Sequence, residues 1–269
     1  MTKQIGVLGC GWLGLPLAVA LLGNGYSVKG STTSEEKLAE LQAKHIRPYL
    51  ISLSENSISG DIEGFLRNVE LLIINIPPKL RGNQRENFVK KMHLLHTEIV
   101  QSAIKQVLFV CSTSVYGDIQ GEVTETTTPL PSTESGRQLL AAEAIFRTSK
   151  ALQTTIVRFG GLIGSDRHPV KMLSGRKSLA KGNHPINLIH RLDCIQIIEF
   201  ILKENWWGKI VNGVYPYHPT KQAYYTSEAL KNNIQPPEYQ ENNNALGKKV
   251  VPKSLLDVKI FRFTTPICK

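Results

Sequence analysis

The sequence predicts an α/β protein, with a doubly wound parallel sheet followed by a smaller C-terminal region. Apolar, β-branched runs alternate with helical segments through the first half of the chain, which is typical of parallel sheets covered on both faces. A glycine-rich turn joins the first run to the first helical segment, and beyond residue 160 the alternation loosens. We therefore expect a core formed by residues 1–160 and a smaller region, 161–269, packed on it.

The first unit reads as strand, turn, helix and strand. Gln4–Leu8 is a short apolar run, and the apolar helix expected over Trp12–Leu22 ends at Gly23. Tyr26–Gly30 continues as the second strand. Ser34, followed by two glutamates, is expected to cap the next helix through its side chain.

The remaining elements follow the same logic of apolar runs between helical segments. Further strands are expected at Tyr49–Leu53, Val69–Ile76, Val107–Cys111, Thr154–Phe159 and Ile210–Tyr215, with a short apolar run at Pro185–Ile189. Helices are expected at about Gln84–Ile104, Thr133–Ser149, from Asp193 as its N-cap, and after Pro219. Loops are expected at Thr124–Pro131 and Asn232–Asn244.

The composition is that of an ordinary globular protein, with 269 residues, 41% hydrophobic and 20% charged. Cysteines 10, 111, 194 and 268 are far apart, which argues against a disulfide framework or a zinc site and favours a reducing, cytoplasmic setting. Gly6–Gly23 is uncharged and resembles a signal peptide or short membrane span. Its glycines favour the strand and helix expected there, so we expect no membrane segment.

The net charge of +10 is concentrated in the C-terminal part. Lys and Arg number 16 against 14 Asp and Glu in residues 1–160, and 16 against 8 in residues 161–269. The dense stretch Arg167–Lys181 has no interleaved aromatics, so nucleic acid is not favoured. A small anionic metabolite is the better match, with a solvated surface loop as the alternative.

Gly9-Cys-Gly11-Trp-Leu-Gly14 matches G-x-G-x-x-G between an expected strand and an expected helix. In this Rossmann context the glycines allow a tight turn, the approach of a pyrophosphate and close helix packing. The N–H groups at the start of the helix bind the anion. We therefore expect Gly9, Gly11, Trp12, Leu13 and Gly14 to bind a dinucleotide, against the alternative of a turn that binds nothing.

The end of the second strand carries Ser31, Thr32 and Thr33 where an acidic residue would hold the ribose of NAD. Hydroxyl groups with Lys29 or Lys37 nearby suit a 2′-phosphate instead. The sequence therefore favours NADP, with NAD as the alternative.

Residues 112–117 read S-T-S-V-Y-G after the strand at Val107–Cys111. This resembles the S-S-x-x-V-Y-G segment of extended short-chain dehydrogenases/reductases, the nucleotide-sugar epimerase and dehydratase group. The resemblance continues through Glu125, Pro131, Glu143, Arg158–Gly164 and Asn187–Asp193 and covers most of the chain. The family's Tyr-x-x-x-Lys pair is absent, because Ser135 and Leu139 stand at those positions. The usual acid/base device is therefore missing.

Asn75-Ile76-Pro77-Pro78 and Asn187-Leu-Ile-His190, with the lost pair, resemble the YeeZ-like group of atypical short-chain dehydrogenases. The resemblance implies an NAD(P)-binding oxidoreductase or epimerase, and we expect hydride transfer on a small anionic metabolite such as a nucleotide sugar. The alternative is a non-catalytic NADP-binding sensor. The substrate, the reaction direction and the oligomeric state stay open, a homo-oligomer included.

The resemblance also suggests site residues. Ser112 matches the family's catalytic Ser/Thr and is expected to contact substrate or nicotinamide ribose, while Asn75, Ile76 and Pro77 would line the cofactor. Tyr116 is the first candidate to replace the missing acid, with a packing aromatic as the alternative. Arg158, Arg176 and His190 are the expected substrate-binding residues. His93 and His96 lack a third ligand, so no metal is expected.

Overall fold

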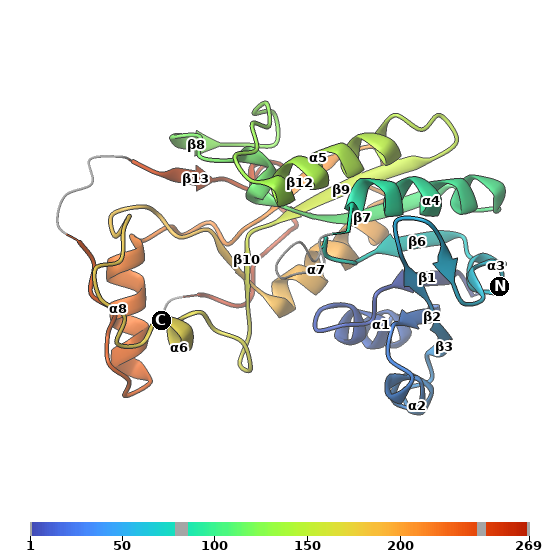
Figure 1. Ribbon diagram of the computed structural model, residues 1–269, viewed down its shortest axis with the longest axis horizontal. Coiled ribbons are helices and arrows are strands. Elements are labelled where there is room, and N and C mark those ends of the chain that lie inside the picture. Colours follow the sequence, from blue (N-terminus) through green and yellow to red (C-terminus); the bar gives the residue numbers. More distant parts are fainter. Residues whose placement is uncertain (1, 79–85, 241–245, 268–269) are drawn as a thin grey trace.

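The computed structural model describes residues 2–78, 86–240 and 246–267, which form a seven-stranded parallel sheet with helices on both faces (Figure 1). The strand order is β12-β9-β7-β6-β1-β2-β3. The strands are β1 (Gln4–Leu8), β2 (Ser27–Thr32), β3 (Arg47–Leu50), β6 (Leu71–Ile74), β7 (Gln106–Ser112), β9 (Gln153–Phe159) and β12 (Ile210–Gly213). The expected doubly wound Rossmann sheet is confirmed.

The strand order reverses between β1 and β6, which are neighbours although β2 and β3 separate them along the chain. Leu8 is paired with Ile74, so the two strands end at the same level. In open parallel sheets, ligands bind in the crevice outside the strand ends at such a reversal. The glycine turn follows β1 and the Asn75 segment follows β6, so both lie at this crevice.

The helices cover the sheet in two layers, visible in Figure 1. One apolar cluster packs α4 (Phe88–Gln101) and α5 (Glu134–Arg147) on one face, and a second packs α1 (Gly14–Gly23) and α7 (Arg191–Lys203) on the other. The other helices are α2 (Glu36–Ala43), α3 (Ile62–Leu66), α6 (Val170–Leu173), α8 (Lys221–Lys231), α9 (Lys253–Leu256) and the 3-10 turn η1 (Thr113–Tyr116). Burial of each large apolar side chain contributes roughly 1.5–3 kcal/mol to the stability of the fold. The packed layers therefore hold the strands, and with them the loops at the strand ends, in place.

The C-terminal elements lie beyond the carboxyl ends of the strands, on the left of Figure 1. They include the parallel pair β10 (Gly161–Ile163) and β11 (Leu188–His190), together with α6 and α8 on a third small apolar cluster. Two more pairs are β8 (Gly121–Val123) with β13 (Lys248–Val250), and β4 (Ser52–Leu53) with β5 (Ile58–Ser59). The division of the chain at residue 160 stays a prediction. Strand β12, which comes after residue 160 along the chain, is part of the central sheet.

Two expected helix caps are wrong. The N-cap of α2 is Glu35 and makes no side-chain cap bond, whereas Ser34 donates its own N–H to the Thr32 hydroxyl at 3.1 Å. The N-cap of α7 is His190, and Asp193 lies inside the first turn, where its buried carboxylate accepts hydrogen bonds from Thr264 and Thr265. Helix α2 therefore starts without a side-chain cap, whereas α7 is capped by His190, and the Asp193 carboxylate is taken up by a long-range contact.

Other expected boundaries shift by a few residues. The run expected at Tyr49–Leu53 divides into β3 and β4, and α4 begins at Phe88. Residues 84–85 of the expected helix and 241–244 of the expected loop lie outside the described residues, as does Cys268. Cys10, Cys111 and Cys194 are buried free thiols.

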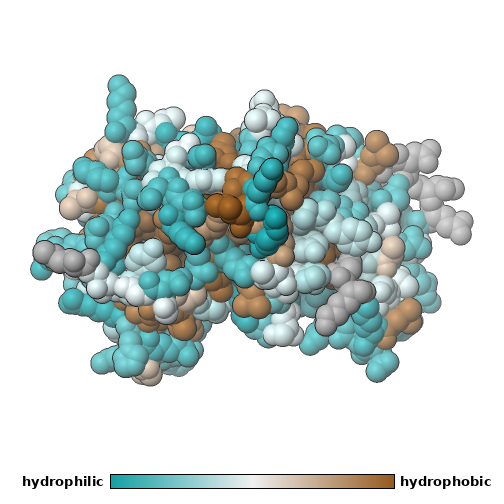
Figure 2. All heavy atoms as spheres, turned by 180° about the vertical axis from the view of Figure 1, so that it is seen from behind, coloured by the Kyte–Doolittle hydropathy of each residue, from teal (hydrophilic) through white to brown (hydrophobic). Residues whose placement is uncertain are grey.

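The surface opposite the view of Figure 1 is mostly hydrophilic, with apolar residues in separate small groups (Figure 2). Within the described ranges, every helix is too short or too polar to cross a lipid bilayer.

Candidate functional site

The glycine turn after β1 has the geometry that each of its glycines was expected to provide. Gly9 has φ +102° and lies so close to β6 that a Cβ would come within 2.5 Å of the Asn75 carbonyl oxygen. A Cβ at Gly14 would overlap the Gly9 carbonyl oxygen. A Cβ at Gly11 would meet nothing within 4 Å, so the turn is closely packed on the protein side and open at Gly11.

Hydrogen bonds from two neighbouring strands hold this turn in place. The Asn75 side-chain amide donates to the Gly9 carbonyl at 3.0 Å, and the Gly9 N–H donates to the Ser31 hydroxyl oxygen at 2.9 Å. The Cys10 N–H donates to the Ser31 carbonyl at 2.8 Å. Asn75 and Ser31, both expected to contact the cofactor, therefore also shape the loop that would bind it.

The start of α1 presents N–H groups at the open position. The first helical bond runs from Leu15 N–H to the Gly11 carbonyl at 3.0 Å. The N–H groups of Gly11, Trp12 and Leu13 have no acceptor in the part of the chain that the structure describes. Such N–H groups at a helix start bind anions, and the bare Gly11 backbone leaves room for one. The turn therefore fits a pyrophosphate.

Trp12 connects this turn to the C-terminal region. Its indole N–H donates to the Asp166 carboxylate at 2.9 Å, which is the main reason that the pKa of Asp166 is lowered. The guanidinium carbons of Arg167 and Arg191 lie 5.1 and 4.5 Å from its ring centroid. Two cations from beyond residue 160 thus stack on the aromatic ring of the glycine turn.

The end of β2 presents one exposed hydroxyl. Ser31 and Thr32 are buried, and the Ser31 hydroxyl is hydrogen-bonded to the glycine turn, whereas Thr33 is exposed. The expected contribution of Lys29 is wrong, because its ammonium is buried and donates to the carbonyls of Gly64 and Arg67 at 2.8 and 2.6 Å. Lys37 is exposed near the start of α2 and remains the nearby cation.

The segment after β6 is held by the end of β1. The Asn75 N–H donates to the Leu8 carbonyl at 2.9 Å, Asn75 and Ile76 are half-buried, and Pro77 is exposed.

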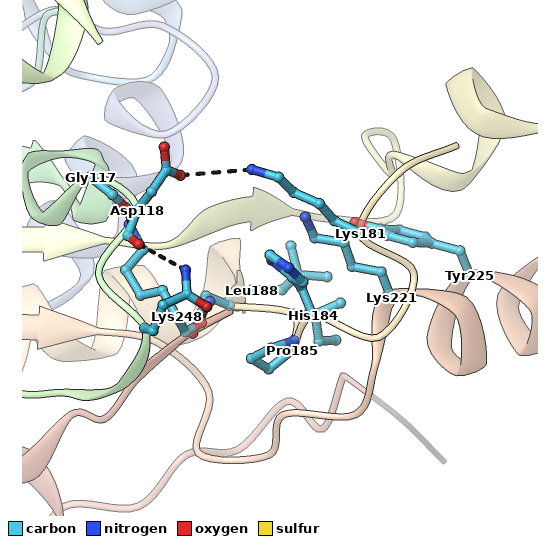
Figure 3. Close-up of a pocket in the computed structure, with 12 residues that line it drawn as sticks. Gly117, Asp118, Lys181, His184, Pro185, Leu188, Lys221, Tyr225 and Lys248 are labelled. Atoms are coloured by element: carbon cyan, nitrogen blue, oxygen red, sulfur yellow. Dashed lines mark hydrogen bonds and ion pairs between the residues drawn. The ribbon is translucent and has the colours of Figure 1, made fainter. Parts of the chain in front are cut away.

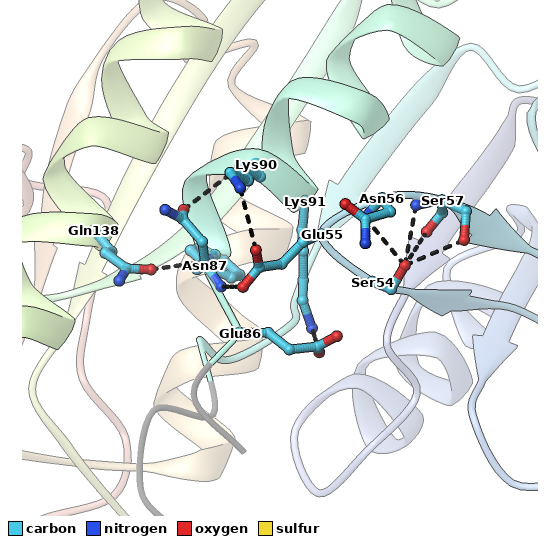
Figure 4. A network of polar contacts seen from close by, with 10 residues as sticks. Ser54, Glu55, Asn56, Ser57, Glu86, Asn87, Lys90, Lys91 and Gln138 are labelled. Atoms are coloured by element: carbon cyan, nitrogen blue, oxygen red, sulfur yellow. Dashed lines mark hydrogen bonds and ion pairs between the residues drawn. The ribbon is translucent and has the colours of Figure 1, made fainter. Parts of the chain in front are cut away.

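A polar network fixes the start of α4 (Figure 4). The Asn87 side chain caps the helix by accepting the Lys90 N–H at 3.1 Å, while its own N–H donates to the Glu55 carboxylate. The Phe88 N–H donates to the Gln138 side chain on α5 at 2.7 Å. This helix start is thereby held by the β4–β5 hairpin and by α5.

Ser112 lies at the carboxyl end of β7, half-buried. Its hydroxyl oxygen accepts the Ser114 N–H at 3.1 Å. Helix α5 approaches closely, since a Cβ at Gly136 would come within 2.8 Å of the Ser114 carbonyl oxygen. Next to this contact Ser135 is half-buried, and Leu139 packs in the core where the family's lysine would stand.

Tyr116 and Arg158 were expected to act on substrate, and their burial argues against both roles. Arg158, 1% exposed, forms a two-bond ion pair with the buried Glu143 carboxylate at 2.9 and 2.6 Å. It also donates to the Tyr116 hydroxyl at 3.0 Å, and that hydroxyl donates to Asn212 at 2.9 Å. Tyr116 has no exposed surface. Both side chains therefore belong to a polar network inside the core.

The other expected substrate residues lie apart from one another. His190 is half-buried at the end of β11 and accepts the Leu192 N–H through Nδ1 at 3.3 Å, and burial lowers its pKa. Arg176 is exposed, and its carbonyl accepts the Glu238 N–H at 2.9 Å. Neither residue lines the lysine-rich pocket at Gly117, which holds Lys181, Lys221 and Lys248.

Lys221 and Lys248, as well as Arg191 at the glycine turn, were not predicted from the sequence. Lys221 and Lys248 come from separate segments that only the fold brings to one pocket, and only the fold brings Arg191 to Trp12. The excess of positive charge after residue 160 was the one signal of them.

Comparisons with known proteins found a matching family model, similar solved structures and a related curated protein. Residues 4–120 match the NAD binding domain of 6-phosphogluconate dehydrogenase. The fold resembles a functionally unknown conserved protein from Silicibacter pomeroyi (TM-score 0.79, 21% identity, 98% of this chain and 95% of that chain). It also resembles UDP-glucuronic acid 4-epimerase from Bacillus cereus in complex with NAD (TM-score 0.79, 16% identity, 98% and 93%).

One relative is close enough to define the family. The chain is 32% identical to Protein YeeZ of Escherichia coli K12 over 254 residues, which cover 94% of this chain and 92% of YeeZ. The glycine turn lies within the part that matches an NAD-binding domain. The protein thus belongs to the YeeZ family and has a doubly wound Rossmann sheet.

Proposed function

We propose that this protein is an NADP-binding oxidoreductase or epimerase that acts on a small anionic metabolite. The observation that carries the proposal is the open glycine turn at the strand-order reversal. There a Cβ at Gly11 would meet nothing within 4 Å, and the N–H groups of Gly11, Trp12 and Leu13 have no acceptor among the described residues. The structural neighbour in complex with NAD and the family match to an NAD binding domain support the dinucleotide.

NADP is favoured over NAD by the residues at the end of β2. Thr33 is exposed there and Lys37 lies near the start of α2, while β2 itself ends without an acidic residue. A hydroxyl and an ammonium suit the 2′-phosphate of NADP, whereas NAD is usually held by a carboxylate.

Ser112 is the residue proposed to contact the substrate. Its oxygen is held by the Ser114 N–H, and its own O–H has no acceptor among the described residues. That proton can be donated to a substrate oxygen at the carboxyl end of β7. A bound nicotinamide would supply the hydride acceptor or donor.

A second candidate function is dinucleotide sensing without turnover. Two features favour it. Leu139 on α5 is buried where the family's lysine would be, and the Tyr116 hydroxyl of η1 is hydrogen-bonded to Arg158 and Asn212 inside the core. A proton donor of the usual kind is therefore lacking among the described residues at β7.

The first experiment compares two aspartate variants at opposite ends of α1. In Gly11→Asp the new carboxylate would accept the free N–H groups and repel a pyrophosphate, so we expect folding to be retained and dinucleotide binding to be lost. Gly23→Asp is the matched control, because a Cβ there also meets nothing within 4 Å. Binding is measured by thermal shift and calorimetry with NADP, NADPH, NAD and NADH.

The second experiment tests turnover. The dinucleotide complex is incubated with nucleotide sugars and phosphorylated metabolites while nicotinamide absorbance and sugar epimers are followed. Binding of none of the four dinucleotides would overturn both candidate functions. Binding that discriminates oxidised from reduced forms, with no turnover, would favour the sensor.

A further inference from the structure

A pocket of about 290 Å³ lies beside the segment that follows η1 (Figure 3). Its walls come from four separate segments: the loop after η1, the loop that leads into β11, the start of α8, and β13. Among the residues that line it are Gly117, Asp118, Lys181, His184, Lys221 and Lys248. The pocket lies outside the glycine turn, whose residues do not line it.

Lys248 is fixed at one side of the pocket. Its ammonium donates to the carbonyls of Thr113 and Gly117 at 2.9 and 2.7 Å, which leaves its third N–H group. The strand that carries it is held by the Asn187 side chain, which donates to the Lys248 carbonyl at 2.8 Å and accepts the Val250 N–H at 2.7 Å. A cation is thus held rigidly next to the segment that begins at Ser112.

Lys221 and Lys181 bring two more cations to the same pocket. Lys221 is the first residue of α8, half-buried, and its ammonium has no hydrogen-bonding or ion-pair partner within the described ranges. Lys181 lies 4.0 Å from the exposed Asp118 carboxylate. Burial, with the nearby Lys181, lowers the pKa of Lys221, and burial lowers that of Lys248.

His184 supplies a polar atom that lacks a partner. It is 8% exposed, and its Nε2 atom is buried without a hydrogen bond in the described structure. Its ring packs against Gly247, where a Cβ would come within 2.6 Å of it. A buried polar atom without a partner costs free energy, so a ligand that supplies a hydrogen bond here would be favoured.

We propose that this pocket binds the phosphate of a small phosphate monoester. Three ammonium groups face one carboxylate, which leaves a charge of about two to be balanced, and a phosphate monoester is close to a dianion at neutral pH. The phosphate oxygens would accept from the lysines and from His184. That this phosphate anchors the metabolite beside Ser112 rests on the proposed function, whereas phosphate binding itself does not.

The test uses inorganic phosphate as the probe, titrated by calorimetry at constant ionic strength. It is performed on the full chain carrying Gly11→Asp, which removes the glycine turn as a competing anion site. We expect phosphate to bind, and acetate, a monoanion, to bind more weakly. Absence of phosphate binding, or equally tight binding of acetate, would overturn the proposal.

Variants locate the binding. Lys181→Gln with Lys221→Gln should weaken phosphate binding roughly tenfold or more, because two charge-assisted hydrogen bonds are lost. His184→Phe should weaken phosphate binding while keeping or raising the melting temperature of the free protein. Lys150→Gln is the control for charge, since Lys150 is exposed and does not line the pocket. Unchanged affinity in the double variant would overturn the assignment.

The outcome can be separated from that of the proposed function. NADP is titrated into the Lys181→Gln and Lys221→Gln double variant with Gly11 intact. We expect its affinity to be unchanged, because neither lysine contacts the glycine turn. Loss of phosphate binding with retained NADP binding supports the pocket, and loss of both would contradict the separation of the two sites.

Discussion

Thr33 is the residue at which the choice between the two dinucleotides can be tested. It is exposed at the end of β2, so a substitution there should leave the core unchanged. In Thr33→Asp, the carboxylate would repel a 2′-phosphate and accept hydrogen bonds from a ribose. We expect NADP affinity to fall by roughly tenfold or more, equivalent to about 1.4 kcal/mol, with NAD affinity unchanged or higher, as measured by calorimetry.

Thr33→Asn is the matched control, because asparagine has nearly the same shape as aspartate and no charge. It should change NADP affinity much less. Equal losses of NADP affinity in the two variants would assign the effect to size, and Thr33 would no longer be the site of 2′-phosphate recognition.

The Tyr116 hydroxyl is predicted to contribute to the free energy of unfolding and not to dinucleotide binding. Its hydroxyl bonds Arg158 and Asn212 inside the core, and burial raises its pKa. Tyr116→Phe removes a hydrogen bond to a charged group, which should lower the free energy of unfolding by about 1.5–3 kcal/mol. Denaturant unfolding measures this, and dinucleotide affinity should stay unchanged.

Tyr217→Phe serves as the control for the loss of a tyrosine hydroxyl, since Tyr217 is 55% exposed. It should change the free energy of unfolding little. If Tyr116→Phe instead abolished turnover at unchanged stability, Tyr116 would be restored as the proton donor.

At the level of elements, the ion pair between Glu143 on α5 and Arg158 on β9 ties a helix to the sheet next to β7. Both side chains are buried, at 0 and 1% exposure. Breaking such a pair leaves an uncompensated buried charge, so Glu143→Gln should lower the free energy of unfolding by about 3–5 kcal/mol. Denaturant unfolding, monitored by circular dichroism, provides the measurement.

The double variant Glu143→Gln, Arg158→Met is the companion experiment, because it removes the remaining charge. We expect it to be more stable than Glu143→Gln alone. The single variant Arg158→Met is measured as well. If the free energy of unfolding of the double variant fell by the sum of the losses in the two single variants, the charges would not interact, contrary to the observed geometry.

Elements with local signals were predicted well from the sequence. Gln4–Leu8 was expected as a strand and is one, because an apolar run with a glycine turn after it leaves little choice. The pairs β8–β13 and β10–β11 were not foreseen, since each strand has three residues and is formed by a partner far along the chain. Lys248 reaches its pocket through β13, so the same lack of local signal concealed it.

Asp193 shows the same limit for a single cap. Its place before an apolar run is typical of an N-cap, but the carboxylate is bound by Thr264 and Thr265 from the end of the chain. A tertiary hydrogen bond of this kind leaves no trace in local sequence. Asp193 does lie in the first turn of α7, but it is not the N-cap, and its hydrogen-bond partners could not be predicted from the neighbouring sequence.

Across the whole molecule, part of the excess positive charge after residue 160 lies at two separate places. Arg167 and Arg191 stack on Trp12 at the glycine turn, and Lys181, Lys221 and Lys248 line the separate pocket. Both places lie beyond the carboxyl ends of the strands, where ligands of such sheets bind. Part of the uneven charge of the sequence therefore lies at two candidate anion-binding sites of the folded protein.

The whole fold should lose stability as the pH falls below 6.5, because burial lowers the pKa of His96, His168, His184, His190 and His218 from that value. Below pH 6.5 the unfolded chain binds protons that the folded chain does not, so the free energy of unfolding decreases until the lower folded pKa values are reached. Urea unfolding at pH 7.5, 6.5 and 5.5 measures the slope. His168→Gln, which keeps a partner for the Tyr224 hydroxyl 2.9 Å away, should reduce the slope. An unfolding free energy independent of pH over this range would contradict the lowered pKa values of these histidines in the folded protein.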